Sequence, residues 1–178
     1  SVNIDGMSIV SSKNNVFGVY SYQDVKGIVR DVNSSNPYSA TLLDGYTNTQ
    51  TIIQRFDSDA KAAYATTQFY VGDKKGMFGQ GKWYLPSLGE LMDFYGTNYE
   101  NMEYPSTANE GDGFNLEKIN TTLEGLGPIA EKMTKNYYWT SSECDSGYTW
   151  VLNMSTGYRG DASKKNNYYV RSFMQVEN

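Results

Sequence analysis

The chain has 178 residues, of which 20% are charged, and its formal net charge is −5. Its length is typical of one domain with a sizeable core, and an aromatic content of 15% is too high for a disordered chain. A mildly acidic chain has no surplus of cations to offer phosphates, which argues against nucleic acid or an anionic membrane as partner. No apolar run approaches the length of a membrane span.

The chain contains a single cysteine, Cys144, and no histidine. An intramolecular disulfide, a Ser-His-Asp triad, a Cys-His pair and a histidine-ligated zinc site are therefore all excluded. Cys144 has no basic neighbour in the sequence that would activate a thiolate, so we interpret it as a small loop residue. We predict that the protein is not an enzyme.

The first forty residues predict short strands followed by a loop. Residues 7–10 and 16–20 are apolar in short bursts, and Lys13-Asn14-Asn15 between them is typical of a turn. Residues 27–30 form another candidate strand, and residues 33–48 are rich in the residues of loops. The chain begins at Ser1 without a signal sequence. We expect such a leader to be removed or to lie outside this segment, so its absence does not argue against export.

A first helix is predicted after residue 48, with Asn48 or Thr49 as its cap. Apolar residues then keep helical spacing: Ile52, Ile53, Phe56, Ala60, Ala63 and Tyr64. Residues 72–81 hold four glycines and predict a flexible connector. This stretch lacks the spacing and the strand context of a phosphate-binding loop, which argues against nucleotide binding.

A second helix is predicted with more local detail. Pro86 keeps the preceding residue extended, Ser87 is a good N-cap, and Glu90 stands where it completes a capping box. Gly96 can end this helix, whose apolar face is Leu88, Leu91, Met92 and Tyr95. We expect Trp83, just before it, to be a core residue. A third helix is indicated by Leu116, Ile119, Leu123 and Leu126, and it would end near Gly125 or Gly127.

The C-terminal part predicts three strands, at residues 135–140, 148–153 and 168–174, of which the first two form a hairpin. Polar loops are predicted at residues 97–115, 141–147 and 155–167. A loop as long as the first is usually functional in a compact domain. The elements together predict an α+β domain, with two or three helices packed on a small, mostly antiparallel sheet and long polar loops.

Five motifs occur in order along these elements: Asp44-Gly45-x-x-Asn48-Thr49, Trp83-Tyr84-Leu85-Pro86-Ser87-x-x-Glu90-Leu91, Tyr138-Trp139-Thr140-Ser141-Ser142-Glu143, Trp150-Val151-Leu152-Asn153 followed by Thr156-Gly157, and Tyr169-Val170-Arg171. In this order they resemble the Lcl C-terminal domain family, bacterial extracellular domains of which some are parts of adhesins. The resemblance covers residues 40–176 of a single domain spanning residues 1–178, and the strands and loop of residues 1–39 match it poorly.

This resemblance implies a C-type-lectin-like fold, related also to that of formylglycine-generating enzymes, and a secreted or cell-surface location. It implies binding rather than catalysis. The formylglycine-generating relatives work with paired cysteines, which a chain with one cysteine cannot reproduce. The Glu143 and Arg171 side chains both lie in matching motifs, and we expect them to form a buried structural ion pair.

A ligand-binding surface is predicted in the loops, because tyrosines and amides gather there with acidic residues. Tyrosine offers rigid contact area at low entropic cost, and its ring can also stack on a sugar. In the alternative interpretation, half of these tyrosines pack on the fold. The candidate residues are Tyr99, Asn101, Tyr104, Asn109, Asp112, Asp145, Tyr148, Tyr158, Arg159 and Asp161.

Two acidic stretches, residues 109–113 and 143–145, offer oxygen ligands of the kind calcium prefers. Neither has the spacing of an EF-hand or of a calcium-dependent lectin, so solvated acidic turns are the favoured interpretation, with no cofactor required. The sequence therefore predicts an extracellular ligand-binding or adhesion module whose partner is a glycan or a surface protein. The alternative is a structural or assembly subunit of a pilus or another surface polymer.

Overall fold

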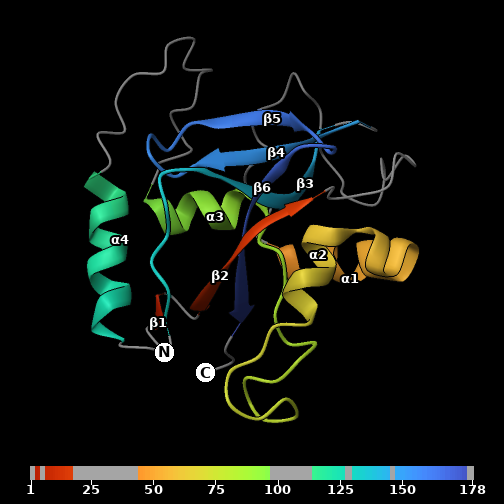
Figure 1. The fold of residues 1–178 in the computed structure, drawn as a ribbon, viewed down its shortest axis with the longest axis horizontal. Coiled ribbons are helices and arrows are strands. Elements are labelled where there is room, and N and C mark those ends of the chain that lie inside the picture. Colours follow the sequence, from red (N-terminus) through yellow and green to blue (C-terminus); the bar gives the residue numbers. More distant parts are fainter. Residues whose placement is uncertain are drawn as a thin grey trace.

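The computed structural model describes residues 3–4, 7–17, 44–96, 114–126, 130–144 and 147–175. Their elements, in chain order, are β1 (Asn3–Ile4), β2 (Met7–Phe17), α1 (Gly45–Phe56), the 3₁₀ helix η2 (Asp57–Asp59), α2 (Lys61–Thr67), α3 (Leu88–Tyr95), α4 (Phe114–Gly125), β3 (Tyr137–Glu143), β4 (Tyr148–Asn153), β5 (Arg159–Ser163) and β6 (Asn167–Gln175). The predicted α+β class is confirmed (Figure 1). The described residues form four α-helices where two or three were expected. The C-type-lectin-like detail stays a prediction.

The described strands form one six-stranded sheet in the order β1-β2-β6-β3-β4-β5. All neighbouring strands are antiparallel except β3 and β6, which run parallel with Tyr138 beside Tyr169. The predicted mostly antiparallel sheet, the β3–β4 hairpin and the closing strand β6 are confirmed. Because β2 pairs with β6, strands from opposite ends of the chain lie side by side at the centre of the molecule.

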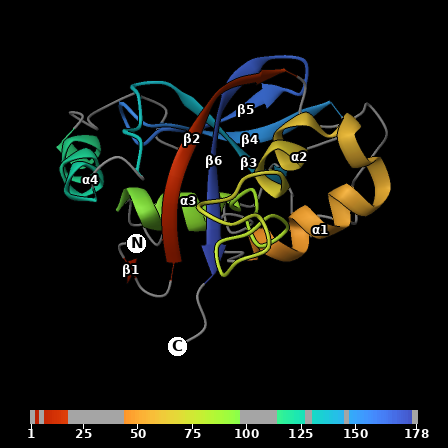
Figure 2. The same cartoon turned by 60° about the horizontal axis from the view of Figure 1, so that its bottom comes forward.

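Helices cover both faces of this sheet (Figure 2). Helices α3 and α4 share a core with Tyr138 of β3, and α1 and α2 share another with the adjacent Trp139. Side chains alternate along a strand, so these two neighbours enter opposite cores. Trp83 is fully buried as predicted, in a third and smaller cluster where its ring meets the Phe69 ring edge-on.

Helix α3 has the predicted capping box. The Ser87 hydroxyl oxygen accepts from the Glu90 N–H at 3.2 Å, and the Glu90 carboxylate accepts from the Ser87 N–H at 2.7 Å. Gly96 ends the helix in the left-handed region, with a φ of 80°. The four predicted apolar positions of this helix are all buried. Local signals therefore define α3 from its first residue to its last.

Glu90 also fixes the start of α1. Its carboxylate accepts from the Gly45 N–H at 3.0 Å and from the Tyr84 hydroxyl at 3.1 Å. A Cβ on Gly45 would lie 2.6 Å from the Ser87 nitrogen and 2.7 Å from the Leu85 carbonyl oxygen, so this close approach requires glycine. The N-terminal ends of α1 and α3 therefore meet at one buried carboxyl group.

The prediction of two strands and a turn within residues 7–20 is wrong. Strand β2 runs through Lys13-Asn14-Asn15 and pairs with β6 on both sides of these residues. The register shifts between Lys13 and Val16. The turn-prone residues therefore form an irregularity within a continuous strand, and the chain does not reverse direction there. The candidate strand at residues 27–30 lies outside the described residues.

The first predicted helix begins earlier than expected and is broken in two. Asp44 caps α1, because its carboxylate accepts from the Thr47 N–H at 3.0 Å, and the predicted caps Asn48 and Thr49 are buried on the inner side of the helix. The break falls at Asp57, whose φ of 45° is left-handed. Helix η2 begins at this residue and α2 follows, which accounts for the additional helix.

Residues 68–82, between α2 and α3, form a loop that projects from the body of the molecule at the bottom of Figure 1. We predicted part of it as a flexible connector, but backbone hydrogen bonds hold it together. The Val71 N–H donates to the Phe78 carbonyl and the Gln80 N–H to the Lys74 carbonyl, both at 2.9 Å. The Trp83 ring N–H also donates to the Phe78 carbonyl, at 3.1 Å, which fastens the loop to a buried side chain.

Candidate functional site

The described members of the predicted ligand surface all lie on or beside the β4–β5 hairpin: Tyr148, Tyr158, Arg159 and Asp161. The other six candidates lie outside the described residues: Tyr99, Asn101, Tyr104, Asn109, Asp112 and Asp145. The predicted loop 155–167 is wrong where residues 159–163 form β5, and the predicted loop 141–147 is wrong where β3 continues to residue 143. In both places backbone pairing with β4 outweighs a polar local sequence.

Tyr148 and Asp161 share one face of this hairpin. The register pairs Tyr148 with Ser163 and Trp150 with Asp161, and paired residues of antiparallel strands have their side chains on the same face. The Tyr148 residue is 45% exposed, and Asp161 is exposed as well. The ring offers stacking area and the carboxylate accepts hydrogen bonds, so together they can contact a polar ligand.

Arg159 and Tyr158 do not join this pair. Arg159 is only 4% exposed, and its guanidinium carbon lies 5.6 Å from the centre of the Trp150 ring, in a cation–π contact. The ring of the half-buried Tyr158 lies beside Gly160. Gly160 and Asp161 are adjacent in β5 and therefore face opposite sides of the sheet. The structure therefore brings together two of the four described candidates, buries the third and directs the fourth to the other face.

A buried ion pair lies beside Tyr148, and it differs from the predicted one. The Lys164 ammonium contacts the Glu143 carboxylate, and both side chains are almost completely buried. The Lys164 backbone N–H also donates to the Gly147 carbonyl at 2.9 Å, so the residue joins the end of β5 to the β3–β4 connection. This arrangement holds the segment that presents Tyr148. The predicted pairing of Glu143 with Arg171 is wrong.

The burial of Lys164 was not predicted from the sequence, for a physical reason. Lys164 precedes Lys165, which is exposed, and both lie in a polar run where nothing local distinguishes a buried lysine from a solvated one. What turns Lys164 inward is the pairing of β5 with β4. In this pairing Ser163 lies opposite Tyr148, which is 15 residues earlier in the chain. The one available signal was the motif containing Glu143, because a buried carboxylate needs a partner.

Arg171, the predicted partner of Glu143, is buried on another part of the sheet. Its Nη2 donates to the Glu131 carbonyl oxygen at 2.7 Å, and burial lowers the pKa of its guanidinium to about 10. Its Nε and Nη1 atoms are buried without a hydrogen bond among the described residues. Arg171 therefore joins β6 to the segment that follows α4, and it is not placed to contact a ligand.

The two acidic stretches give no metal site in the described part of the chain. Residues 109–113 lie outside it, while the Glu143 carboxylate is engaged by Lys164 and the buried Cys144 side chain packs into the core formed with α3 and α4. Within the described ranges, no three side chains of the acidic, thiol or imidazole kind are grouped to hold a metal ion. Nor is any helix in these ranges both long and apolar enough to cross a membrane.

Comparison with known proteins shows a similarity of fold and no match in sequence to a family or a curated protein. No family model and no curated protein matches the chain. Among solved structures, the chain is similar to a fimbrial protein from Bacteroides ovatus ATCC 8483, with a TM-score of 0.56 and 18% sequence identity. The similarity covers 96% of this chain and 35% of that one, so this chain spans about a third of the fimbrial protein. The resemblance to the Lcl C-terminal domain family stays a prediction.

Proposed function

We propose that this chain is a non-catalytic module of a bacterial surface polymer, a fimbria-like structural or assembly subunit. The observation that carries the proposal is the fold shared with a fimbrial protein over 96% of this chain. The module would assemble with other surface proteins and would lie outside the cell. Membership of a family of bacterial extracellular domains, which the five sequence motifs suggest, is part of the same proposal.

The candidate site favours this role over glycan recognition. The described residues offer one exposed ring and one exposed carboxylate on a face of the hairpin, while Arg159 is buried and Tyr158 lies on the other face. Sugar-binding sites usually need several polar groups that converge around a concave surface. Protein–protein contacts need no such concavity and use flat, adaptable surfaces.

The proposal can be tested by locating the chain in cells of the bacterium that encodes it. Surface appendages are sheared from cells, purified by sedimentation and probed with antibodies raised against residues 1–178. We expect the chain in the polymer fraction at a fixed ratio to the main subunit, and gold-labelled antibody on the appendages in electron micrographs. A chain that stays with the cell envelope after shearing, or in the cytosol, would contradict the proposal.

A second candidate function is ligand binding at the Tyr148–Asp161 face, favoured by the exposure of both residues on a hairpin held by a buried ion pair. Glycan and protein arrays probed with the purified chain would test it. We expect Tyr148→Ala to abolish any captured signal, while Tyr46→Ala, at an equally exposed tyrosine on α1, should leave it unchanged. Equal loss in both variants would speak against a site at this face.

A further inference from the structure

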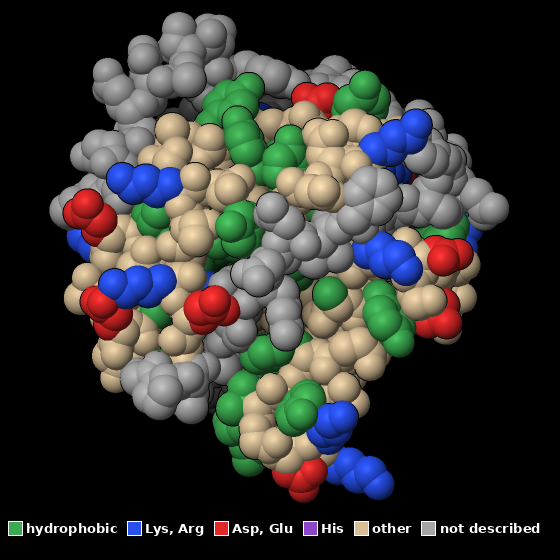
Figure 3. Space-filling model, viewed as in Figure 1, with side chains coloured by type: hydrophobic (Ala, Val, Ile, Leu, Met, Phe, Trp, Pro, Cys, Tyr) green, Lys and Arg blue, Asp and Glu red, His purple; other side chains and the backbone are tan. Residues whose placement is uncertain are grey.

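The projecting 68–82 loop combines a defined backbone with exposed apolar side chains. Met77 is 71% exposed and Tyr70 is 38% exposed. Phe69, next to Tyr70, instead packs on the buried Trp83 ring. Hydrophobic side chains and lysines lie together on the lower lobe of the space-filling view (Figure 3). Exposed apolar side chains rimmed by charges are typical of surfaces that contact another protein surface.

The sequence specifies the shape of this loop. A Cβ on Gly79 would lie 2.8 Å from the Gly76 carbonyl oxygen, so the turn closes only around glycine. The Gly81 N–H donates to the Thr67 carbonyl at 2.9 Å, which closes the base of the loop. A pre-formed loop loses little conformational entropy when it is covered by another surface, which favours such a contact.

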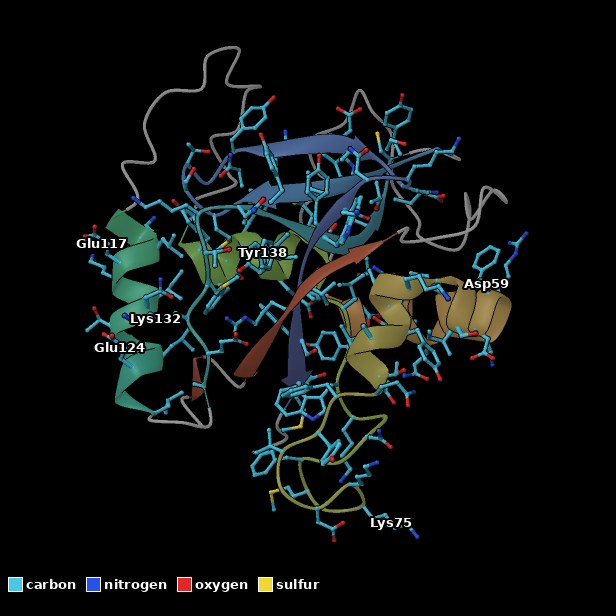
Figure 4. All side chains as sticks on the ribbon, viewed as in Figure 1. Asp59, Lys75, Glu117, Glu124, Lys132 and Tyr138 are labelled. Carbon is cyan, nitrogen blue, oxygen red and sulfur yellow. The ribbon has the colours of Figure 1, made fainter. Side chains whose placement is uncertain are left out.

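The loop lies at the end of the sheet where both ends of the described chain also lie. Strand β1 pairs with the start of β2, where Met7 lies opposite Gln175, the last residue of β6. Met174 and Trp83 form the small cluster on which the loop packs. Both ribbon views show the end of β6 beside the loop, and the outer end of the loop, with Lys75, extends further from the sheet (Figure 4). A polypeptide that continues beyond β6 therefore leaves the module beside the loop.

The fimbrial protein with a similar fold is a longer polypeptide. This chain spans about a third of it, so in that protein the fold is joined to further residues. Domains joined in one polypeptide contact one another through surfaces that resemble transient protein–protein interfaces. A rigid loop beside the point where the polypeptide continues is well placed for such a contact, because the linkage keeps the effective concentration of the joined domain high.

We propose that the 68–82 loop is the contact of this module with an adjoining domain of the same polypeptide, joined to it at this end of the sheet. Met77 and Tyr70 pack on the adjoining domain. The Lys74 ammonium, 5.2 Å from the centre of the Tyr70 ring, stays hydrated at the rim of the contact. The inference goes beyond the proposed function, because it concerns the domain to which this module is joined and not whether the polypeptide enters a polymer.

Hydroxyl-radical footprinting of the complete polypeptide, produced from its full reading frame and diluted until it sediments as a monomer, tests the inference. We expect this polypeptide to exceed the present chain by at least about 50 residues, the size of a small domain. Tyr46, on α1, is 44% exposed and is the matched control for Tyr70. Oxidation follows solvent exposure, so a covered Tyr70 should react at least about tenfold more slowly than Tyr46, as expected for a contact that is closed most of the time. Met77→Asp should open the contact and make Tyr70 as reactive as Tyr46, whereas Tyr148→Asp, at an equally exposed side chain on β4, should leave Tyr70 protected.

Four results would overturn the inference: a reading frame without room for another domain, a Tyr70 as reactive as Tyr46, protection that Met77→Asp does not relieve, or protection that appears only as the concentration rises. The last result would place a second copy on the loop. Unchanged melting temperature of Met77→Asp excludes unfolding as the cause, since exposed substitutions cost little stability, and Met77→Ser replaces this variant if it does not fold. A protected Tyr70 in a polypeptide that is absent from sheared appendages would contradict the proposed function and leave this inference intact. An unprotected Tyr70 in a polypeptide found in the appendages would do the reverse.

Discussion

Two buried glutamates hold this molecule together in different ways. Glu90 accepts hydrogen bonds from neutral donors, the N–H groups of Gly45 and Ser87 and the hydroxyl of Tyr84. Glu143 is held by the cation of Lys164. Neutral donors solvate a carboxylate without cancelling its charge, whereas a cation cancels the charge but must itself be removed from water. The two sites should therefore respond differently to mutation.

The largest expected effect follows from breaking the Glu143 site. Lys164→Met should destabilise the fold by about 3–5 kcal/mol, because it leaves a carboxylate buried without its cation. Urea unfolding would measure this loss. Lys165→Met, at the exposed neighbouring lysine, is the matched control and should change stability by less than about 0.5 kcal/mol.

The double variant Lys164→Met/Glu143→Leu sharpens the result, since replacing both members of a buried pair by apolar residues is often neutral or stabilising. We expect it to recover most of the stability lost in Lys164→Met. If Lys164→Met loses no more stability than the control Lys165→Met, water must reach the Glu143 carboxylate when its partner is removed. It would also remove the distinction drawn between the two glutamates.

The next largest effect concerns the Glu90 site and its closest backbone contact. Gly45→Ala should cost about 1–3 kcal/mol, because the added methyl group meets the backbone of Leu85 and Ser87 and must displace the donors of Glu90. Gly125→Ala, at the last residue of α4, meets no atom within 4 Å and should be neutral or stabilise by up to about 1 kcal/mol. Thermal melts of both variants distinguish close packing from general helix propensity. Equal melting temperatures would mean that α1 can shift away from α3 at little cost.

These two sites also show how far the sequence predicts the molecule. The Ser87–Glu90 capping box and the stop at Gly96 lie within ten residues of one another, so local chemistry is enough to predict α3. The contact of Glu90 with Gly45 joins residues 45 positions apart. The Asp44-Gly45 pair is the only local feature of the sequence that points to it. The burial of Lys164, the strand β5 and the continuous β2 depend on which strands pair, and polar local sequence argues against all three.

A smaller effect is expected at the cap of α3. Ser87→Ala removes the oxygen that accepts from the Glu90 N–H and should cost about 1 kcal/mol in urea unfolding. Asp44→Ala removes the corresponding cap of α1, whose hydrogen bond is exposed, and should cost less because water replaces the lost acceptor. A cost of Asp44→Ala equal to or above that of Ser87→Ala would show that burial of the cap adds nothing.

The last prediction concerns the pH response of Glu90, which we expect to be the smallest because opposing causes act on it. Burial raises the pKa of the Glu90 carboxyl, and the hydrogen bonds from Ser87, Tyr84 and Gly45 lower it, with burial the larger cause. The folded chain therefore holds this proton to higher pH than the unfolded chain, in which a glutamate has a pKa of about 4.3. The contribution of Glu90 to stability is then complete below that value and declines as pH rises through the folded pKa. The difference in free energy of unfolding between the natural chain and Glu90→Gln should accordingly fall as pH rises from the ordinary glutamate range. A difference that grows with pH would mean that the neutral donors outweigh burial at Glu90.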